Sequence, residues 1–307
     1  MKIGIASHIV KDSIIDTEGK EIESLGGPAC YGSIIAKTFK LDSYLFTKVG
    51  IDILKDLEFL KENGILIKKD KQIDEKSQTT RFQLILNKDG DRKMRLLAKC
   101  SHIEMNCTDT DNLDGIILSP ILDEIPNELF DSITKTMKDK FIILDPQGFL
   151  RIWNKETLQI LYKQYVDLDL RGLSAVKTDE QELLALTNGI GSIEGMKLLK
   201  NKYNLEFVIT TGFNQISLLN KNIVYSLSFK KIPAQDNTGL GDILTSAFSC
   251  AYLKEKDPLW ALCFGAGAVV SSLNTNKKGL EKIPRKMNLI ERNASYFYNT
   301  IKFKIID

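Results

Sequence analysis

A glycine-rich turn opens the last quarter of the chain with the sequence Asp236-Asn237-Thr238-Gly239-Leu240-Gly241-Asp242, followed by the apolar segment 243–253. This pattern predicts the start of a helix, where free backbone N–H groups and the positive end of the helix dipole favour an anion. The glycines let a phosphate approach the backbone closely. We expect the dipole to hold the Asp242 carboxylate ionised, so that it can accept a hydroxyl proton during phosphoryl transfer. Taken alone, the spacing also fits a helix cap and a tight turn.

Strand-like and helix-like segments alternate on both sides of this turn. Short apolar runs predict strands at 3–6, 44–47, 115–118, 141–144, 173–176 and 206–210, and an antiparallel pair at 216–219 and 223–227. Helices are predicted at 51–63, 154–165, 179–188, 241–255, 258–274 and 286–299, with another opening at Pro28. Parallel-type strands separated by helices indicate an α/β sandwich.

Two early hairpins do not fit the alternating pattern. The first is predicted at 14–23 around Glu18-Gly19, and the second joins 79–86 to 92–98 through the turn 87–91. We expect them to pair as a small sheet outside the main one, which could serve as a lid.

Composition excludes several classes of protein. The 307 residues include 42 basic and 40 acidic side chains, for a net charge of +2, which argues against a strongly basic nucleic-acid binder. Five scattered cysteines without a CxxC motif indicate reduced thiols in a cytoplasmic protein and give no support for zinc. The weakly polar stretch 261–273 is too short to span a bilayer, and the N-terminus does not resemble a signal peptide. We therefore expect neither nucleic acid nor membrane as a partner.

Two further motifs could contact a ligand. Gly26-Gly27 precedes a small-residue helix and permits close contact with a ligand, although plain helix entry explains it equally. Asp12 follows the first strand and precedes the first hairpin, at the end of a parallel strand where α/β sheets bind ligands, although it could also be a turn residue. Neither a GxxxxGK[ST] loop nor a GxGxxG fingerprint is present.

Taken together, these motifs resemble the ribokinase-like carbohydrate kinase family, also called the PfkB family, over nearly the whole chain. Residues 236–242 match its signature Asp-Thr-x-Gly-Ala-Gly-Asp, with Asn and Leu at the second and fifth positions. Gly26-Gly27 matches its N-terminal glycine pair, Asp12 its sugar-binding Asp, and residues 49–52 its Val-Gly-x-Asp. The resemblance implies Asp242 as catalytic base, with Gly239, Leu240 and Gly241 forming the anion site.

The resemblance also assigns the donor side of the site. Residues 177–182 align with the family's Asn-x-x-Glu motif, with Asp179 replacing Asn, which implies that Glu182 and Asp179 hold Mg²⁺, through water. Thr211-Gly212 aligns with the Thr-x-Gly region that contacts nucleotide, and Lys177 is assigned to the same role. The implied cofactors are ATP and Mg²⁺.

The fold implied by this resemblance is a three-layer α/β/α sandwich formed by residues 1–307 as one domain, with a small β lid at about 11–25 and 79–100. The expected activity is phosphorylation of a hydroxyl of a small polyol or sugar by a monomer or homodimer. Residues 144–151 and the N-terminal segments are most similar to the myo-inositol kinase branch, which makes Arg151 a substrate-binding residue. Tyr31 stands where the family often has Asn. A nucleoside kinase, a 2-keto-3-deoxygluconate kinase and an inactive ligand-binding protein of the same fold are the alternatives.

Overall fold

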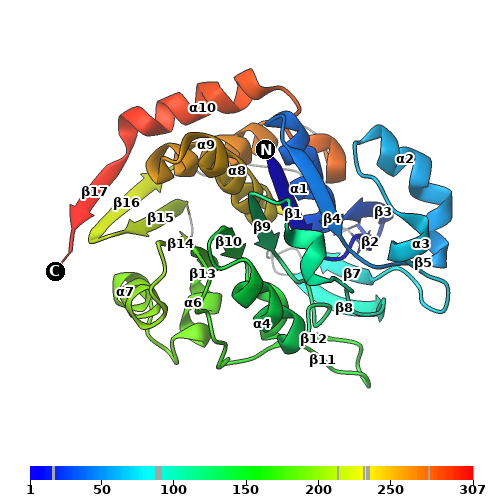
Figure 1. The fold of residues 1–307 in the computed structure, drawn as a ribbon. Helices are drawn as coiled ribbons and strands as arrows, with labels where there is room; N and C mark the ends of the chain where they lie inside the picture. The colour runs from blue at the N-terminus through cyan, green and yellow to red at the C-terminus, as the bar shows by residue number, and fades with distance from the viewer. Residues whose placement is uncertain are drawn as a thin grey trace.

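The computed structural model describes residues 1–15, 18–86, 92–212, 214–230, 232, 236–275 and 277–306. Within these residues, a nine-stranded sheet runs through the centre of the molecule in the order β17-β16-β15-β14-β13-β10-β9-β1-β4 (Figure 1). Its strands are β1 (Lys2–Ala6), β4 (Asp42–Phe46), β9 (Gly115–Leu118), β10 (Phe141–Leu144), β13 (Ala175–Asp179), β14 (Phe207–Gly212), β15 (Gln215–Asn220), β16 (Ile223–Ser228) and β17 (Lys302–Ile305). The strands from β4 to β14 pair in parallel, and β15, β16 and β17 continue the sheet antiparallel.

Helices cover both faces of this sheet. One face carries α1 (Pro28–Thr38), α8 (Leu240–Glu255) and α9 (Pro258–Leu273), with α10 (Met287–Thr300) packed on α9 (Figure 1). The opposite face carries α4 (Asn127–Thr136), α6 (Glu180–Leu186) and α7 (Ser192–Tyr203). The expected three-layer sandwich is therefore confirmed.

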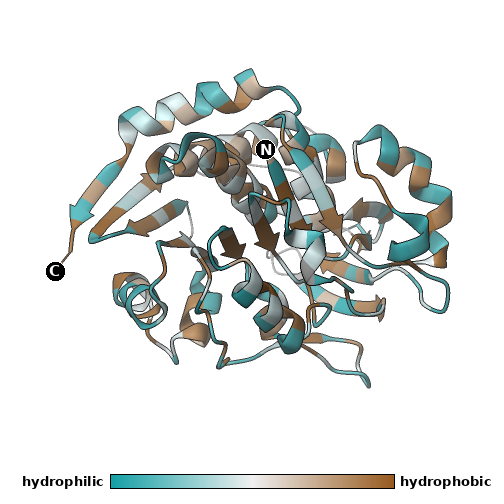
Figure 2. Cartoon of the chain, in the orientation of Figure 1, coloured by the Kyte–Doolittle hydropathy of each residue, from teal (hydrophilic) through white to brown (hydrophobic). Residues whose placement is uncertain are grey.

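The strand residues alternate between two apolar cores. Ile117 and Ile143 pack with the α1, α8 and α9 side, whereas Ile116 and Ile142 pack with the α4, α6 and α7 side. Successive side chains of a strand point to opposite faces, so a parallel strand covered on both sides must be apolar throughout. Figure 2 shows β9 and β10 as continuously hydrophobic, which explains why they could be predicted from short apolar runs.

A small sheet lies beside the main one, with strand order β3-β2-β7-β8. It joins β2 (Val10–Ile15) and β3 (Glu21–Gly26) to β7 (Arg81–Leu86) and β8 (Arg92–Ala98), with β2 and β7 parallel. The two hairpins thus pair with each other, as expected from the sequence. The predicted turn at 87–91 lies outside the described residues. Asp12 is inside β2, so its predicted place before the first hairpin is wrong: β2 starts four residues earlier than expected.

The remaining elements connect these sheets. They are β5 (Val49–Gly50) paired with β6 (Ile73–Asp74), the 3-10 helices η1 (Ile51–Asp56), η2 (Cys107–Thr110) and η3 (Gly279–Lys282), and the short helices α2 (Leu57–Glu62), α3 (Lys69–Gln72) and α5 (Gln147–Leu150). In the described part of the chain, no helix combines the length and apolar character needed to cross a membrane.

The predicted helix at 154–165 is wrong. This segment turns back and ends in β12 (Ile160–Tyr162), antiparallel to β11 (Arg151–Trp153). Asn154 Oδ1 accepts the N–H groups of Glu156 and Thr157 at 3.0 and 3.2 Å, which stabilises a turn there. The N–H of Leu96 in β8 donates to Leu158 O at 2.8 Å. The β11–β12 hairpin is therefore also hydrogen-bonded to the small sheet.

Candidate active site

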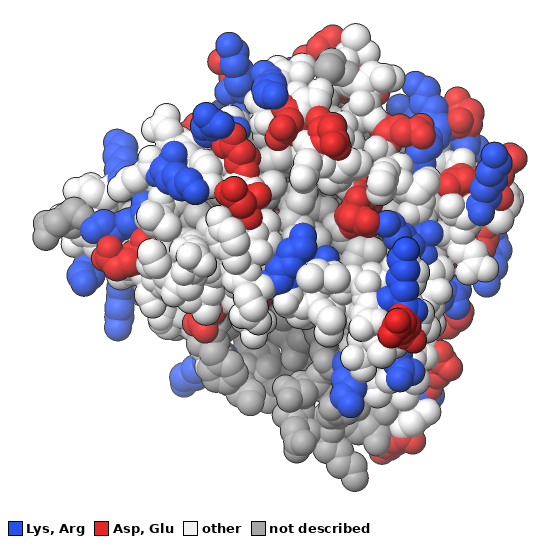
Figure 3. Space-filling model, turned by 90° about the horizontal axis from the view of Figure 1, so that it is seen from below, with Lys and Arg blue, Asp and Glu red and all other residues white. Residues whose placement is uncertain are grey.

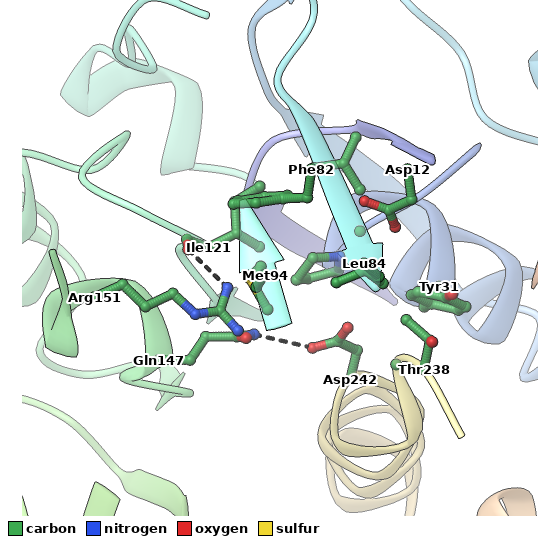
Figure 4. Close-up of a pocket in the computed structure, with 14 residues that line it drawn as sticks. Asp12, Tyr31, Phe82, Leu84, Met94, Ile121, Gln147, Arg151, Thr238 and Asp242 are labelled. Atoms are coloured by element: carbon green, nitrogen blue, oxygen red, sulfur yellow. Dashed lines mark hydrogen bonds between the residues drawn. The ribbon is translucent and has the colours of Figure 1, made fainter. Parts of the chain in front are cut away.

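A cavity lies between the small sheet, α1, α5 and the start of α8 (Figure 4). Its polar lining comes from residues far apart in the sequence, and its apolar lining comes mainly from the small sheet. The lining residues are Val10, Asp12, Gly27, Pro28, Tyr31, Phe82, Leu84, Met94, Ile121, Gln147, Arg151, Thr238, Gly239 and Asp242. Five residues predicted to form the site, Asp12, Gly27, Arg151, Gly239 and Asp242, therefore face one space.

The glycine-rich turn begins α8 as its sequence predicts. Gly239 adopts a left-handed conformation with φ +72°, and a Cβ atom there would lie 2.4 Å from the Tyr31 ring, so a side chain would collide with that ring. The first helical hydrogen bond runs from Ile243 N–H to Gly239 O at 3.0 Å. The N–H groups of Leu240, Gly241 and Asp242 precede it and have no acceptor within the helix. This end of α8 can therefore accept an anion.

Asp242 projects from this helix end toward the cavity, where Gln147 Nε2 donates to its Oδ1 at 3.3 Å (Figure 4). Burial, followed by the negative charge of Asp145, raises the pKa of Asp242 to about 7, and the cations of Lys177 and Arg151 only partly oppose this. Burial and the neighbouring carboxylate of Asp145 therefore oppose the ionised form of Asp242 that its place at the helix start predicts. A carboxyl with a pKa near 7 is well matched to a general base at neutral pH.

Lys177 lies behind the glycine-rich turn. Its Nζ is 2.9 Å from Asp145 Oδ2 and 3.9 Å from Glu182 Oε2, and all three side chains are buried. Burial favours the neutral amine, but Asp145 and Glu182 outweigh it and raise the pKa of Lys177. A Cβ atom on Gly241 would lie 3.0 Å from Lys177 Nζ. The ammonium group thus adds positive charge directly beside the anion-accepting end of α8.

Asp179 and Glu182 form a reciprocal cap at the start of α6. Glu182 N–H donates to Asp179 Oδ1 at 2.8 Å, and Asp179 N–H donates to Glu182 Oε2 at 2.7 Å. Burial raises the pKa of Glu182 to about 8, although Lys177 acts in the opposite direction. Thr211 is the direct partner of Asp179 in β14, and a Cβ on Gly212 would lie 2.6 Å from Glu180 Oε1. The residues predicted for nucleotide and metal are thus brought together at the ends of β13 and β14.

Asp12 enters the cavity from the small sheet. It is buried, and a Cβ atom on Gly26 would lie 3.5 Å from its Oδ2. Gly27 has φ +87°, and a Cβ there would lie 2.7 Å from His8 O, so glycine is required where the chain enters α1. Gly27 lines the cavity directly, whereas a Cβ on Gly26 would be in ordinary van der Waals contact with Tyr31 and Asp12.

The Val49–Asp52 motif supports the small sheet. Asp52 Oδ1 accepts the Thr79 N–H at 2.7 Å and its hydroxyl at 2.8 Å, and Asp52 Oδ2 lies 3.2 Å from Lys11 Nζ. These contacts hold β2 and the segment before β7, and these two strands carry Asp12 and Phe82 into the cavity.

Arg151 closes the side of the cavity opposite Asp12 (Figure 4). Its Nη1 donates to Ile121 O at 2.8 Å, while Nε is buried without a hydrogen-bond partner among the described residues. Sequence reasoning assigned no role to Asp145 and Gln147, although both lie in the segment 144–151 that identified Arg151. Their position just after the buried strand β10 was the available signal, because ligands bind at the carboxyl ends of parallel strands.

Side chains of both charges share the face of the molecule that is seen from below (Figure 3). Figure 3 shows basic and acidic side chains interspersed over the described part of the face seen from below, without a large patch of one sign.

No protein-family model matches this sequence, and no curated protein matches it either. The fold, however, is similar to solved kinases. A pyrophosphate-dependent kinase in the ribokinase family, solved with sulfate, has a TM-score of 0.79 at 20% identity, covering 95% of this chain and 99% of that chain. Such a kinase solved with a pyrophosphate analog and myo-inositol has a TM-score of 0.75 at 20% identity, covering 95% and 100%. Ribokinase of Arabidopsis thaliana, solved with ribose and ATP, has a TM-score of 0.70 at 17% identity, covering 95% and 98%. The chain thus has the fold of the ribokinase family.

Proposed function

We propose that this chain, with its ribokinase fold, is a phosphotransferase that moves a phosphoryl group from ATP to a hydroxyl of a small polyol or sugar. One observation carries the proposal. The Asp242 carboxyl, with a pKa near 7, faces the cavity at a helix end whose first N–H groups are available to an anion. A base beside an anion site is the arrangement that transfer to an alcohol requires.

The acceptor lies in the cavity between Asp12 and Arg151. The Asp12 carboxylate can accept hydrogen bonds from two neighbouring hydroxyls, and the Arg151 guanidinium can donate to another oxygen. Gly27 lets the ring approach the backbone. Phe82, Leu84 and Met94 cover the acceptor from the small sheet, which acts as a lid and keeps water from taking the phosphoryl group.

The chemical step uses the start of α8. Asp242 takes the proton of the acceptor hydroxyl as its oxygen attacks phosphorus. The N–H groups of Leu240, Gly241 and Asp242 stabilise the charge on the phosphoryl oxygens, and Lys177 adds positive charge behind Gly241. Burial strengthens these electrostatic contacts.

ATP is assigned to the ends of β13 and β14, where Thr211 and Gly212 meet Asp179. Among the described residues, no group of three or more His, Cys, Asp or Glu side chains is placed to hold a metal ion directly. Hydrated Mg²⁺ fits this place, because Asp145 Oδ1 is buried without a hydrogen-bond partner among the described residues and Glu182 adds a second carboxyl. Glu182 and Asp179 would hold the ion through water, together with Asp145. Bound Mg²⁺ would neutralise phosphoryl charge.

Myo-inositol or a similar cyclic polyol is the proposed acceptor, from the motif in residues 144–151 and from the likeness to a kinase solved with myo-inositol. A nucleoside is the second candidate, because Phe82, Leu84, Met94 and Ile121 form an apolar wall that a base could contact. A 2-keto-3-deoxygluconate acceptor would place its carboxylate on Arg151. Pyrophosphate is the alternative donor, since two similar structures are pyrophosphate-dependent kinases.

The experiment is a matrix of donors and acceptors. Purified protein is given ATP or pyrophosphate together with myo-inositol, ribose, 2-keto-3-deoxygluconate, adenosine or cytidine, and kcat/KM is measured for each pair. We expect ATP with a cyclic polyol to give the highest value. A higher value for any nucleoside replaces the polyol assignment, and a preference for pyrophosphate replaces ATP. Absence of transfer in every pair, with binding of a polyol retained, favours an inactive ligand-binding protein.

A further inference from the structure

Lys282 is a fully buried lysine directly beneath the glycine-rich turn. It ends the 3-10 helix η3 and is only 1% exposed. Its Nζ lies 2.9 Å from Asp236 Oδ2, donates to Asp236 O at 3.1 Å and also donates to Thr238 O. One ammonium group therefore contacts three oxygens of the segment that leads into α8.

The same segment is held by a second set of contacts from Asp236. Its Oδ1 accepts the Thr238 N–H at 2.8 Å, and its Oδ2 accepts the Gly279 N–H at 2.8 Å. Burial alone would raise the pKa of Asp236, but Lys282 and these N–H groups outweigh it and lower the pKa. Asp236 and Lys282 thus tie residues 236–238 to residues 279–282, which are more than 40 positions away in the chain.

The position of Lys282 relative to the cavity links these contacts to the candidate active site. Thr238 and Gly239 line the cavity, whereas Lys282 contacts the same turn from its buried side. Lys282 Nζ also lies 5.9 Å from the centre of the Tyr31 ring, which packs against Gly239. Because C=O and N–H are antiparallel in a trans peptide, the Thr238 C=O that accepts from Lys282 directs the N–H of Gly239 the opposite way.

Folding stability alone does not explain why Lys282 and Asp236 are buried together. A buried ion pair is often no more stable than apolar residues of the same volume, since both charges lose their hydration. Its best-attested benefit is to select one arrangement of the chain over others. The arrangement selected here is that of residues 236–239, which set the direction of the free N–H groups at the start of α8.

We propose that Lys282 is a positioning residue for phosphoryl transfer: its ammonium holds the carbonyls of Asp236 and Thr238, and so fixes the turn from which the N–H groups of residues 240–242 extend toward the transferring phosphoryl group. This inference rests on the proposed function. Lys282 does not touch the acceptor or the donor, and it acts through the turn. Its effect is therefore on kcat more than on the KM of the acceptor.

The experiment compares Lys282→Met with Lys278→Met, in which a lysine exposed on the same segment is changed. Lys282→Met should lower kcat by about tenfold or more, the scale of losing aligned donors, while the acceptor KM changes by less than about twofold. Ammonium or potassium ions should restore part of the lost rate, because the three oxygens left behind can bind a small cation, whereas tetramethylammonium should not. Lys278→Met should match wild type in every measurement.

A double variant that lacks both charges distinguishes a positioning role of Lys282 from a role in folding. Asp236→Asn combined with Lys282→Met removes both charges, so it should recover the thermal midpoint lost by Lys282→Met without recovering kcat. A double variant that regains the wild-type rate, or a Lys282→Met variant with unchanged kcat, overturns the proposal.

Amide hydrogen exchange tests the same proposal without an activity assay. The N–H groups of Thr238, Ile243 and Gly279, which donate to Asp236 Oδ1, Gly239 O and Asp236 Oδ2, should exchange faster in Lys282→Met than in wild type or Lys278→Met. Unchanged exchange in these amides overturns the inference even if the kinase assay fails. Faster exchange in a protein that transfers no phosphoryl group supports the positioning role and rejects the proposed function instead.

Discussion

Replacing Asp242 with Asn should stabilise the folded protein above pH 7. Burial, and then the charge of Asp145, raise the pKa of Asp242 from its ordinary value of 3.8 to about 7. The folded state therefore holds this proton more tightly than the unfolded state does. Above pH 7 the folded protein must carry a poorly solvated charge at Asp242, which the amide of Asn lacks.

The size and the sign of this change in folding stability follow from proton linkage. A pKa raised from 3.8 to about 7 corresponds to at most about 4 kcal/mol of destabilisation by the charged form. This destabilisation is complete above pH 7, decreases as the pH falls from 7 toward 3.8, and vanishes below 3.8, where both states are protonated. Asp242→Asn should thus gain up to about 4 kcal/mol over wild type at high pH, and the gain should shrink as the pH is lowered.

Urea unfolding at about pH 5 and about pH 8.5 measures this difference. Asp139→Asn is the matched control, because Asp139 is exposed and should show no comparable pH-dependent gain. An Asp242→Asn variant that is equally stable or less stable than wild type at high pH would refute the raised pKa of Asp242.

Three further outcomes are expected. In wild type, kcat/KM should fall about tenfold for each pH unit below about 7 as Asp242 becomes protonated, and a flat profile from about pH 5.5 to 8.5 would contradict its role as base. Asp12→Ala should raise the acceptor KM and lower kcat, reducing kcat/KM by about 10- to 100-fold with little change in the thermal midpoint. A loss of stability without a kinetic change would make Asp12 structural. Excess chelator should abolish transfer, and Glu182→Gln should raise the Mg²⁺ concentration needed; an unchanged metal titration would remove Glu182 from that role.

The fold could be predicted where the sequence carries local signals. The buried strands β9 and β10 are short apolar runs, and the start of α8 is fixed by Gly239 and the helix that follows. The segment 154–165 could not be predicted, because its hairpin depends on the Asn154 turn and on pairing with β8, which is distant in sequence. Helix α7 and strand β17 were not predicted for a related reason: α7 is stabilised by packing on β14, and β17 by pairing with β16.

In the candidate site, too, some features could be predicted from the sequence and others could not. Asp12, Gly27, Arg151 and Asp242 were selected by motif and converge on one cavity. The pKa of Asp242 could not be predicted, because it depends on burial and on Asp145, neither of which is visible from the turn itself. The proposed role of Lys282 could not be predicted either, because its contacts with the turn form only when η3 folds beneath it.

The most direct test of the central claim follows the radiolabelled γ-phosphoryl group of ATP in the presence of Mg²⁺ and myo-inositol at about pH 8. Wild type should transfer the label to the polyol, and Asp242→Asn should transfer it about 10² to 10⁴ times more slowly while still binding ATP. Transfer by Asp242→Asn at more than half the wild-type rate would contradict the account, because the acceptor hydroxyl would then lose its proton without Asp242.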